Sequence, residues 1–150
     1  MARSLPAPIN GVDLLMLDLD GVIYRGAEAI PHAVESARRA ARLARVAFVT
    51  NNASRTDGSI ADHLTGLGLD VQAHDVVTSP HAAVRLLADH VPHGSLVLVV
   101  GGAGLTFELE RAGYSVTRDS SNNPTAVVQG FAREVGWVDL AEASIALHRG

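Results

Sequence analysis

The chain has no cysteine and no lysine among its 150 residues. Without cysteine it can form no disulfide framework, and a thiolate nucleophile is excluded. All 12 basic residues are arginine, so a reaction step that needs an ammonium group must obtain it from elsewhere. No apolar run reaches the ~18 residues of a membrane-spanning helix, and the first ten residues lack the apolar core of a signal peptide. We therefore predict a cytoplasmic protein.

The composition is that of a folded protein. Hydrophobic residues make up 47% of the chain and charged residues 19%, which is typical of globular rather than disordered proteins. The formal net charge of -4 offers no basic surface for nucleic acid. We therefore expect neither a nucleic acid nor a membrane as the partner.

Strands and helices are predicted to alternate along the chain. Apolar runs predict strands at Leu14–Asp18, 46–50, 75–78, Leu96–Val100 and Ala126–Gln129. Helical spacing and capping residues predict helices from Pro31 to about residue 44 and over 57–67, 79–90, 103–112 and 139–148. This alternation favours parallel pairing and an α/β fold.

Residues 91–94 (Val-Pro-His-Gly) are typical of a hinge. We therefore predict one region over residues 1–92 and a second over 93–150. An α/β pattern would continue with a strand after the helix at 139–148, so we expect this chain to be part of a longer protein.

The most informative segment is Asp-Leu-Asp-Gly-Val at residues 18–22, directly after an apolar run. Side chains two residues apart on a strand point to the same face, so Asp18 and Asp20 are expected to lie together. Gly21 lets the backbone leave the strand sharply. Two like charges this close repel each other, so the pair favours a divalent cation, a shared proton, or both.

A second polar segment, Thr-Asn-Asn-Ala-Ser-Arg at residues 50–55, follows the next predicted strand. The carboxyl ends of parallel strands meet at one edge of a sheet, which would bring Thr50 near the two aspartates. The Thr50 hydroxyl and the backbone N–H groups of the turn are suited to bind phosphate oxygens. Arg55 is a candidate bidentate partner for an anionic substrate.

Segments 18–22 and 48–52 together resemble motifs I and II of the haloacid dehalogenase (HAD) superfamily of phosphohydrolases. The likeness continues through residues 24–26, 30–31, 51–55, 75–79, 99–104 and 128–131. These segments resemble the subgroup with a C2-type α/β cap, which includes NagD-like, p-nitrophenyl, phosphoglycolate and glycerol-3-phosphate phosphatases. The resemblance implies a Rossmann-like HAD core, its first half in residues 1–92, and part of a cap in 93–150.

The resemblance also implies a mechanism. Asp18 would be the nucleophile that forms an aspartyl-phosphate, and Asp20 would protonate the leaving alcohol and later take a proton from water. Mg²⁺ would be the cofactor, bound by the Asp18 carboxylate and the Asp20 main-chain carbonyl. Thr50 and the Asn51 amide would hold the transferred phosphoryl group. Asn52 and Arg55 are further candidates for binding a small phosphate ester.

Two parts of the HAD pattern are absent from this sequence. The family has a motif III lysine and motif IV acids, and neither a lysine nor a G-D-x-x-x-D segment is present. In C2-capped members both motifs follow the cap. We therefore expect the 150 residues to be incomplete as an enzyme, and the resemblance implies a possible homodimer through the cap.

Two other functions remain open from the residues alone. Gly101, Gly102 and Gly104 follow a predicted strand and could form a Rossmann-type nucleotide-binding loop, although Phe107 stands where the third glycine should be. A near-match of this kind is a weak signal, and we favour close packing between strand and helix as the explanation of these glycines. A non-catalytic assembly unit is the other alternative.

Overall fold

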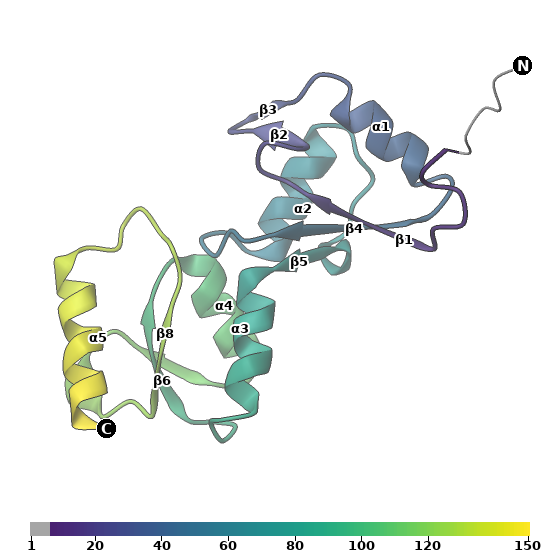
Figure 1. The fold of residues 1–150 in the computed structure, drawn as a ribbon. Coiled ribbons are helices and arrows are strands. Elements are labelled where there is room, and N and C mark those ends of the chain that lie inside the picture. Colours follow the sequence, from purple (N-terminus) through teal and green to yellow (C-terminus); the bar gives the residue numbers. More distant parts are fainter. Residues whose placement is uncertain (1–6) are drawn as a thin grey trace, which may run out of the picture. The chain divides into compact units, whose positions relative to one another are not determined.

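The computed structural model describes residues 7–150. Packing divides the chain into two compact units. The first unit holds residues up to Thr50 together with Ile60–Val77, and the second holds Asn51–Ser59 together with Thr78–Gly150. Both units combine helices with parallel strands (Figure 1). The predicted α/β class is therefore confirmed. The boundary predicted at residue 92 concerns the core and cap of the family, and it stays a prediction.

The first unit is built on a sheet in the order β1-β4-β5. Strand β1 (Leu14–Asp18) pairs in parallel with β4 (Arg45–Thr50), with Leu17 beside Phe48 and Asp18 beside Val49. Apolar residues of α1 (Ala33–Ala40) and α2 (Asp57–Gly66) join Leu17 and Phe48 in one core. The unit also holds the hairpin β2 (Tyr24–Arg25) and β3 (Glu28–Ala29), the 3₁₀ turn η1 (Ala73–Asp75), and β5 (Val76–Thr78).

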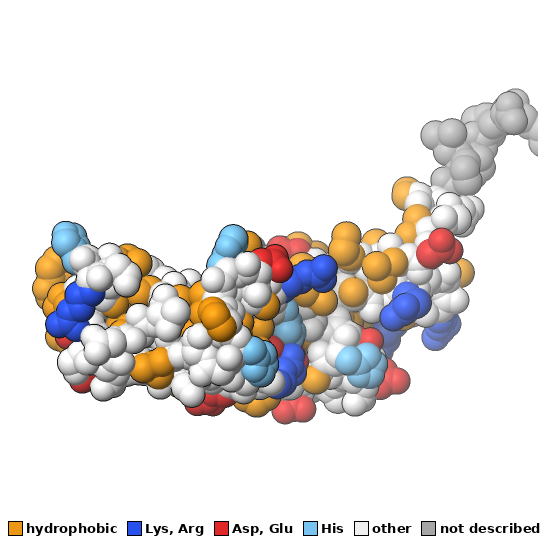
Figure 2. Space-filling model, turned by 90° about the horizontal axis from the view of Figure 1, so that it is seen from below, with side chains coloured by type: hydrophobic (Ala, Val, Ile, Leu, Met, Phe, Trp, Pro, Cys, Tyr) orange, Lys and Arg blue, Asp and Glu red, His pale blue; other side chains and the backbone are white. Residues whose placement is uncertain are grey.

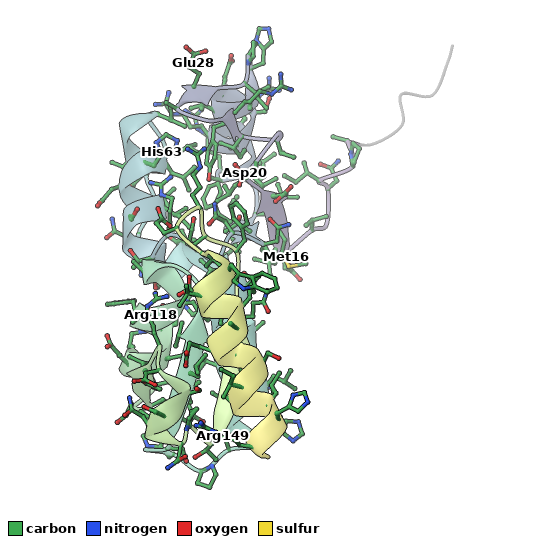
Figure 3. All side chains as sticks on the ribbon, turned by 90° about the vertical axis from the view of Figure 1, so that its left-hand side faces the viewer. Met16, Asp20, Glu28, His63, Arg118 and Arg149 are labelled. Atoms are coloured by element: carbon green, nitrogen blue, oxygen red, sulfur yellow. The ribbon has the colours of Figure 1, made fainter. Side chains whose placement is uncertain are left out.

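One expectation about β1 is wrong. The apolar run before Asp18 favoured a buried strand, but Leu14 is 50% exposed and Met16, labelled in Figure 3, is 69% exposed. The core of this unit forms on one side of β1, where Leu17 packs. The alternation of a strand then leaves Leu14, Met16 and Asp18 on its uncovered face.

The second unit holds a three-stranded parallel sheet in the order β7-β6-β8. Its elements are α3 (Ser79–Ala88), β6 (Leu96–Val100), α4 (Ala103–Arg111), β7 (Ser115–Thr117), the 3₁₀ turn η2 (Ser120–Asn122), β8 (Ala126–Gln129) and α5 (Trp137–Arg149). The central strand β6 is buried on both sides: Val97 and Val99 pack in a core with α3 and α4, and Leu98 and Val100 pack against α5. A central parallel strand covered on both faces reads as a continuous apolar run, which is why its limits were predicted correctly.

The helix limits differ from prediction where the backbone caps differ. Helix α1 begins at Ala33 rather than Pro31, because His32 has a left-handed φ of 67°. Helix α5 begins at Trp137 rather than Asp139, because Asp139 lies in the first turn and accepts a hydrogen bond from the Gly136 N–H over 2.8 Å. An acid in the first turn that reaches back to the N-cap amide is a common helix start.

The surface mixes apolar and polar side chains. On the face drawn in Figure 2, hydrophobic side chains are interspersed with polar and charged ones. Within residues 7–150 the structure contains no helix that combines the length and apolarity needed to cross a membrane.

Candidate active site

Asp18 and Asp20 flank a buried leucine at the carboxyl end of β1. Leu19 between them is fully buried, whereas both acidic residues are exposed. This alternation is imposed by an extended backbone, in which successive side chains point to opposite sides. Gly21 then adopts a φ of 83°, and its N–H donates a hydrogen bond to Tyr24 O over 2.8 Å. The turn predicted from Gly21 is present, and Figure 3 labels Asp20 beside it.

The charges of this pair are not offset by any basic side chain of residues 7–150. Within the described part of the chain, neither Asp18 nor Asp20 takes part in an ion pair. The backbone hydrogen bonds of the turn end on Leu19 O and Tyr24 O, so Asp20 O accepts none of them. Two uncompensated carboxylates and an unused carbonyl are hard oxygen ligands, the kind that Mg²⁺ prefers. The residues present therefore fit this ion.

Thr50 lies at the end of the neighbouring strand. Because Asp18 is in register with Val49, the two parallel strands end side by side, and Thr50 is the next residue of β4. Thr50 is only 3% exposed, whereas Asp18 is exposed. The pairing of strand ends expected from the sequence is present, and the role of the Thr50 hydroxyl stays a prediction.

Asn51 and Asn52 begin the second unit, directly after Thr50. The Asn51 carbonyl accepts a hydrogen bond from the Ser79 hydroxyl over 2.9 Å. The Asn52 side chain accepts from the Ser54 N–H over 2.8 Å and from its hydroxyl over 2.7 Å. An asparagine that bonds to the backbone two residues on forms a local turn. These contacts give the segment a defined conformation.

Arg55 lies just before α2 and is held by Ser59 of that helix. Its Nε donates to Ser59 Oγ over 3.1 Å, and one terminal nitrogen donates to Ser59 O over 2.8 Å. These hydrogen bonds turn the guanidinium toward the first turn of α2. The part of Arg55 in substrate binding stays a prediction.

The glycine-rich residues after β6 serve close packing. The Gly104 N–H donates to Ser54 O over 3.2 Å. A Cβ atom added to Gly104 would lie 2.3 Å from Arg55 O, and one on Gly102 would lie 3.1 Å from Ser54 Cα. Only residues without a side chain permit so close an approach. Polypeptide therefore fills the space beside Gly102 and Gly104, which supports the packing interpretation of the glycines over a nucleotide-binding loop.

A groove of about 430 Å³ in the first unit lies away from the aspartates. Arg38 and Arg42 of α1, Arg45 at the start of β4, and Asp70 and Asp75 before β5 line it. Open α/β sheets bind ligands at the carboxyl ends of their strands, and this groove lies toward the amino end of β4. We therefore do not include it in the candidate site.

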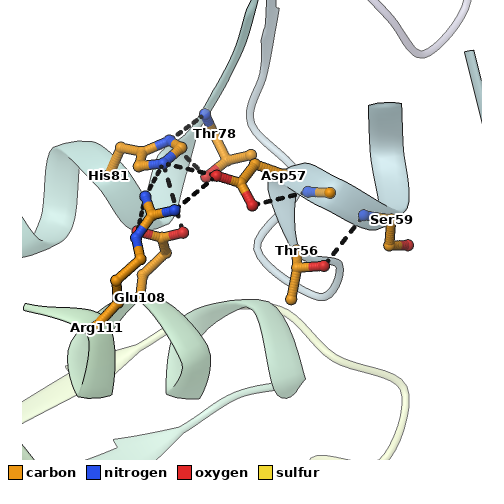
Figure 4. A network of polar contacts seen from close by, with 8 residues as sticks. Thr56, Asp57, Ser59, Thr78, His81, Glu108 and Arg111 are labelled. Carbon is orange, nitrogen blue, oxygen red and sulfur yellow. Dashed lines mark hydrogen bonds and ion pairs between the residues drawn. The ribbon is translucent and has the colours of Figure 1, made fainter. Parts of the chain in front are cut away.

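A second cluster of charged side chains was missed by the sequence analysis (Figure 4). Asp57 at the start of α2, His81 in the first turn of α3, and Glu108 and Arg111 of α4 meet within the second unit. Arg111 NH1 lies 2.9 Å from Asp57 Oδ2, and its NH2 lies 2.7 Å from Glu108 Oε2. The side chains of Asp57 and Glu108 are only 8% and 4% exposed. These residues are far apart in the sequence and match no motif, so no sequence signal connected them.

The charge state of Asp57 is set by opposing effects. Burial by itself would raise the pKa of the Asp57 carboxyl. The Gly58 N–H, 2.7 Å from Asp57 Oδ1, together with the Arg111 guanidinium and His81, outweighs burial and lowers the pKa below its ordinary value. Asp57 is therefore ionised at neutral pH, and this buried negative charge requires Arg111 as its partner.

The ligand atoms of Asp57, His81 and Glu108 lie within 4.8 Å of one another, as in a metal site. The chemistry disfavours a metal here. The Thr78 N–H donates to His81 Nδ1 over 3.0 Å, and a terminal nitrogen of Arg111 lies 2.8 Å from His81 Nε2, so both ring nitrogens already have partners. Arg111 already supplies a positive charge to both carboxylates. A metal ion would have to displace the Arg111 guanidinium from the two carboxylates and from His81.

Comparison with known proteins identifies the class. The family of haloacid dehalogenase-like hydrolases matches residues 15–115, well over half of the chain. The chain belongs to this family, as the resemblance predicted. The matched range includes Asp18, Asp20 and Thr50.

The individual relatives are phosphatases. The D-glycerol 3-phosphate phosphatase of Mycobacterium tuberculosis is 41% identical over 138 residues, which cover 92% of this chain and 38% of that protein. The glycerol-3-phosphate phosphatase of Gallus gallus is 38% identical over 109 residues, or 71% of this chain and 35% of that protein. The chain thus spans well under half the length of these two relatives.

Solved structures agree with this assignment. The glycerol phosphate phosphatase of Mycobacterium tuberculosis in complex with magnesium has a TM-score of 0.88 at 40% identity, over 95% of this chain and 43% of that one. The p-nitrophenyl phosphatase of Archaeoglobus fulgidus has a TM-score of 0.78 at 28% identity, over 93% of this chain and 51% of that one. The fold predicted from the resemblance is thereby confirmed.

Proposed function

We propose that this chain carries the nucleophile of a magnesium-dependent phosphomonoesterase. The observation that carries the proposal is the pair of exposed, unpaired carboxylates, Asp18 and Asp20, at the end of a parallel strand. An Asp18 carboxylate oxygen attacks phosphorus while the ester P–O bond breaks. Asp20 gives its proton to the departing alcohol oxygen. In the second step Asp20 takes a proton from the water that attacks the aspartyl-phosphate, and inorganic phosphate leaves.

The Asp18 carboxylate and the Asp20 main-chain carbonyl would hold Mg²⁺. When bound, the ion would offset the negative charge of Asp18 and of the phosphate oxygens. The fit of the donor atoms supports this assignment: both carboxylates lack a cationic partner within residues 7–150, and the Asp20 carbonyl is unused in its turn. The magnesium complex of the relative from Mycobacterium tuberculosis supports it further.

The substrate is a small phosphate ester. Thr50 and the Asn51 amide would contact the transferred phosphoryl group, whose charge is spread over its equatorial oxygens in the transition state. Asn52 and Arg55 stay candidates for contacts to the rest of the substrate. Relatives that are named glycerol phosphate phosphatases favour glycerol phosphate over phosphoglycolate.

A chimera tests the proposal directly. Residues 1–150 replace the matching segment of the Mycobacterium tuberculosis phosphatase, so that the uncovered part of that relative supplies any remaining groups. We expect Mg²⁺-dependent release of phosphate from glycerol 3-phosphate. Asp18→Asn should abolish turnover, because an amide cannot act as the nucleophile.

Asp13→Asn is the matched control. Asp13 is an exposed acid just before β1, and its side chain has no role in the proposed reaction. This variant should keep the activity of the unsubstituted chimera. A folded Asp18→Asn chimera that retains turnover, or a covalent phosphate adduct trapped on another residue, would contradict the proposal.

A further inference from the structure

The segment that follows Thr50 is anchored to α3 and α4 at three points within the second unit. Its first residue, Asn51, accepts a hydrogen bond from Ser79 at the start of α3 over 2.9 Å. In its middle, Ser54 O accepts from the Gly104 N–H at the start of α4 over 3.2 Å. At its end, Asp57 binds Arg111 of α4. We call residues 51–57 the anchored segment.

His81 connects two of these anchor points. Its Nδ1 accepts from the backbone N–H of Thr78, the residue next to Ser79. Its Nε2 lies 3.5 Å from Asp57 Oδ2 and 3.4 Å from Glu108 Oε1 (Figure 4). The first turn of α3 therefore contacts Asn51 through Ser79 and Asp57 through His81. Both ends of the anchored segment are fixed by the same turn of helix.

Arg111 is the cation that allows the cluster to close. It contacts Asp57 and Glu108 with different nitrogens, and both carboxylates are almost fully buried. Among residues 7–150, Glu108 Oε1 finds no hydrogen-bond partner, so Glu108 depends on Arg111 at its other oxygen. Without Arg111 the two buried carboxylates would lie close together with no guanidinium partner. Uncompensated buried charge of this kind is strongly disfavoured.

We propose that Arg111 and His81 are positioning residues that hold the anchored segment, and with it the Asn51 amide, in the conformation that receives phosphate. This inference rests on the proposed function, because it presumes that Asn51 contacts the phosphoryl group. Arg111 and His81 act through Asp57 and Thr78, and they act on the conformation of the segment rather than on the reacting atoms.

The test uses the 150-residue chain and two readouts from nitrogen-15 NMR. The first is amide hydrogen exchange across residues 51–59. The second is the shift of the Asn51 amide signal as inorganic phosphate is added with Mg²⁺. Arg111→Met should speed exchange in the anchored segment and weaken the apparent affinity for phosphate, each by about tenfold. Arg111→Lys, which retains the charge, should recover part of both.

Controls separate a positioning role from a loss of folding. Amides of β6 should keep their protection, since Val97–Val100 are buried away from the cluster's charges. Arg85→Met is the matched variant: Arg85 is an exposed helical arginine whose side chain has no hydrogen bond or ion pair within residues 7–150. If Arg111→Met fails to fold, His81→Ala removes the link to Thr78 and should give the same pattern.

Each other outcome overturns the inference. Unchanged exchange in folded Arg111→Met and His81→Ala would show that the segment is not held by the cluster. Faster amide exchange in the variants with an unchanged shift of the Asn51 signal on adding phosphate would show that the cluster has only a structural role. Tight Mn²⁺ binding that His81→Ala abolishes would identify a metal site instead. If the Asn51 amide signal of the wild type does not shift when phosphate is added, phosphate binding at Asn51 itself is refuted. That result needs no variant, so it distinguishes failure of the proposed function from failure of this inference.

Discussion

Asp57 carries its negative charge where burial opposes ionisation. The Gly58 amide and Arg111 compensate for that burial, so the pKa of Asp57 in the folded protein is lower than its ordinary value of 3.8. A carboxyl with a lowered pKa stabilises the folded state above the unfolded-state pKa. This stabilisation is lost as the pH falls through the folded-state pKa.

We therefore expect Asp57→Asn to remove part of the acid sensitivity of the protein. The free energy of unfolding of the wild type should fall as the pH drops below about 4, and the variant should show a shallower fall. At pH 7 the variant should be less stable by about 1–3 kcal/mol, because Arg111 loses a buried charged partner. Urea unfolding followed by circular dichroism over a pH series measures both effects.

Other carboxyls contribute to the same pH range. Hydrogen bonds from Ser121 and Ser120 lower the pKa of Asp119 and Glu142, so the variant should keep some acid sensitivity. Asp13→Asn, at an exposed acid, should match the wild type. An Asp57→Asn curve that is parallel to the wild type at every pH would contradict the argument.

At the scale of residues, sequence reasoning predicted the acidic pair at the end of β1 and missed the charged cluster around Asp57. Asp18 and Asp20 were predicted as a pair because their spacing alone determines the alternation around Leu19. His81, Glu108 and Arg111 come from two different helices, and only tertiary packing brings them to Asp57. A histidine without metal-binding spacing carries no signal that it will join such a cluster.

At the scale of elements, helix caps and close contacts between backbones determined limits that the periodicity of the sequence did not predict. The limits of β1, β6 and β8 were predicted correctly from their apolar runs. The hairpin β2–β3 was missed because strands of two residues are too short to show alternation. Helix α3 begins at Ser79, and the preceding residue, Thr78, is its N-cap.

The start of α4 offers a test of close packing. Gly104→Ala would place a methyl group 2.3 Å from Arg55 O and 2.8 Å from Ala53 O, both rigid backbone atoms. We expect a loss of about 1–3 kcal/mol in stability, as for other overpacked sites, measured by thermal or urea unfolding. Gly66→Ala, where nothing lies within 4 Å of the added atom, should leave stability unchanged or slightly raised. Equal effects at the two positions would contradict the packing interpretation.

At the scale of the whole molecule, the charge inventory limits the chemistry. The chain has no lysine, and neither Asp18 nor Asp20 has a cationic partner within residues 7–150. The two glycerol phosphate phosphatases are more than twice as long as their matched regions. The groups that would offset the charge of Asp18 and phosphate are therefore expected from additional polypeptide.

We expect the 150-residue chain alone to hydrolyse p-nitrophenyl phosphate at least about 10²–10³ times more slowly than the active chimera, the usual cost of losing one preorganised charge donor. Steady-state assays with Mg²⁺ measure the ratio. The Asp18→Asn chain sets the background rate. Full Mg²⁺-dependent turnover by the isolated chain would refute its proposed incompleteness.

The sequence by itself determined the class of the protein and the position of its acidic pair. Apolar runs, glycines and the spacing of Asp18 and Asp20 are local features, and local features suffice when the physics is the alternation of a strand. Only the tertiary structure decided that Gly104 lies against Arg55 and that Arg111 neutralises Asp57 and Glu108. Such contacts depend on how separate helices pack. Side chains that pair across a long stretch of sequence produce no periodic pattern from which the pairing could be predicted.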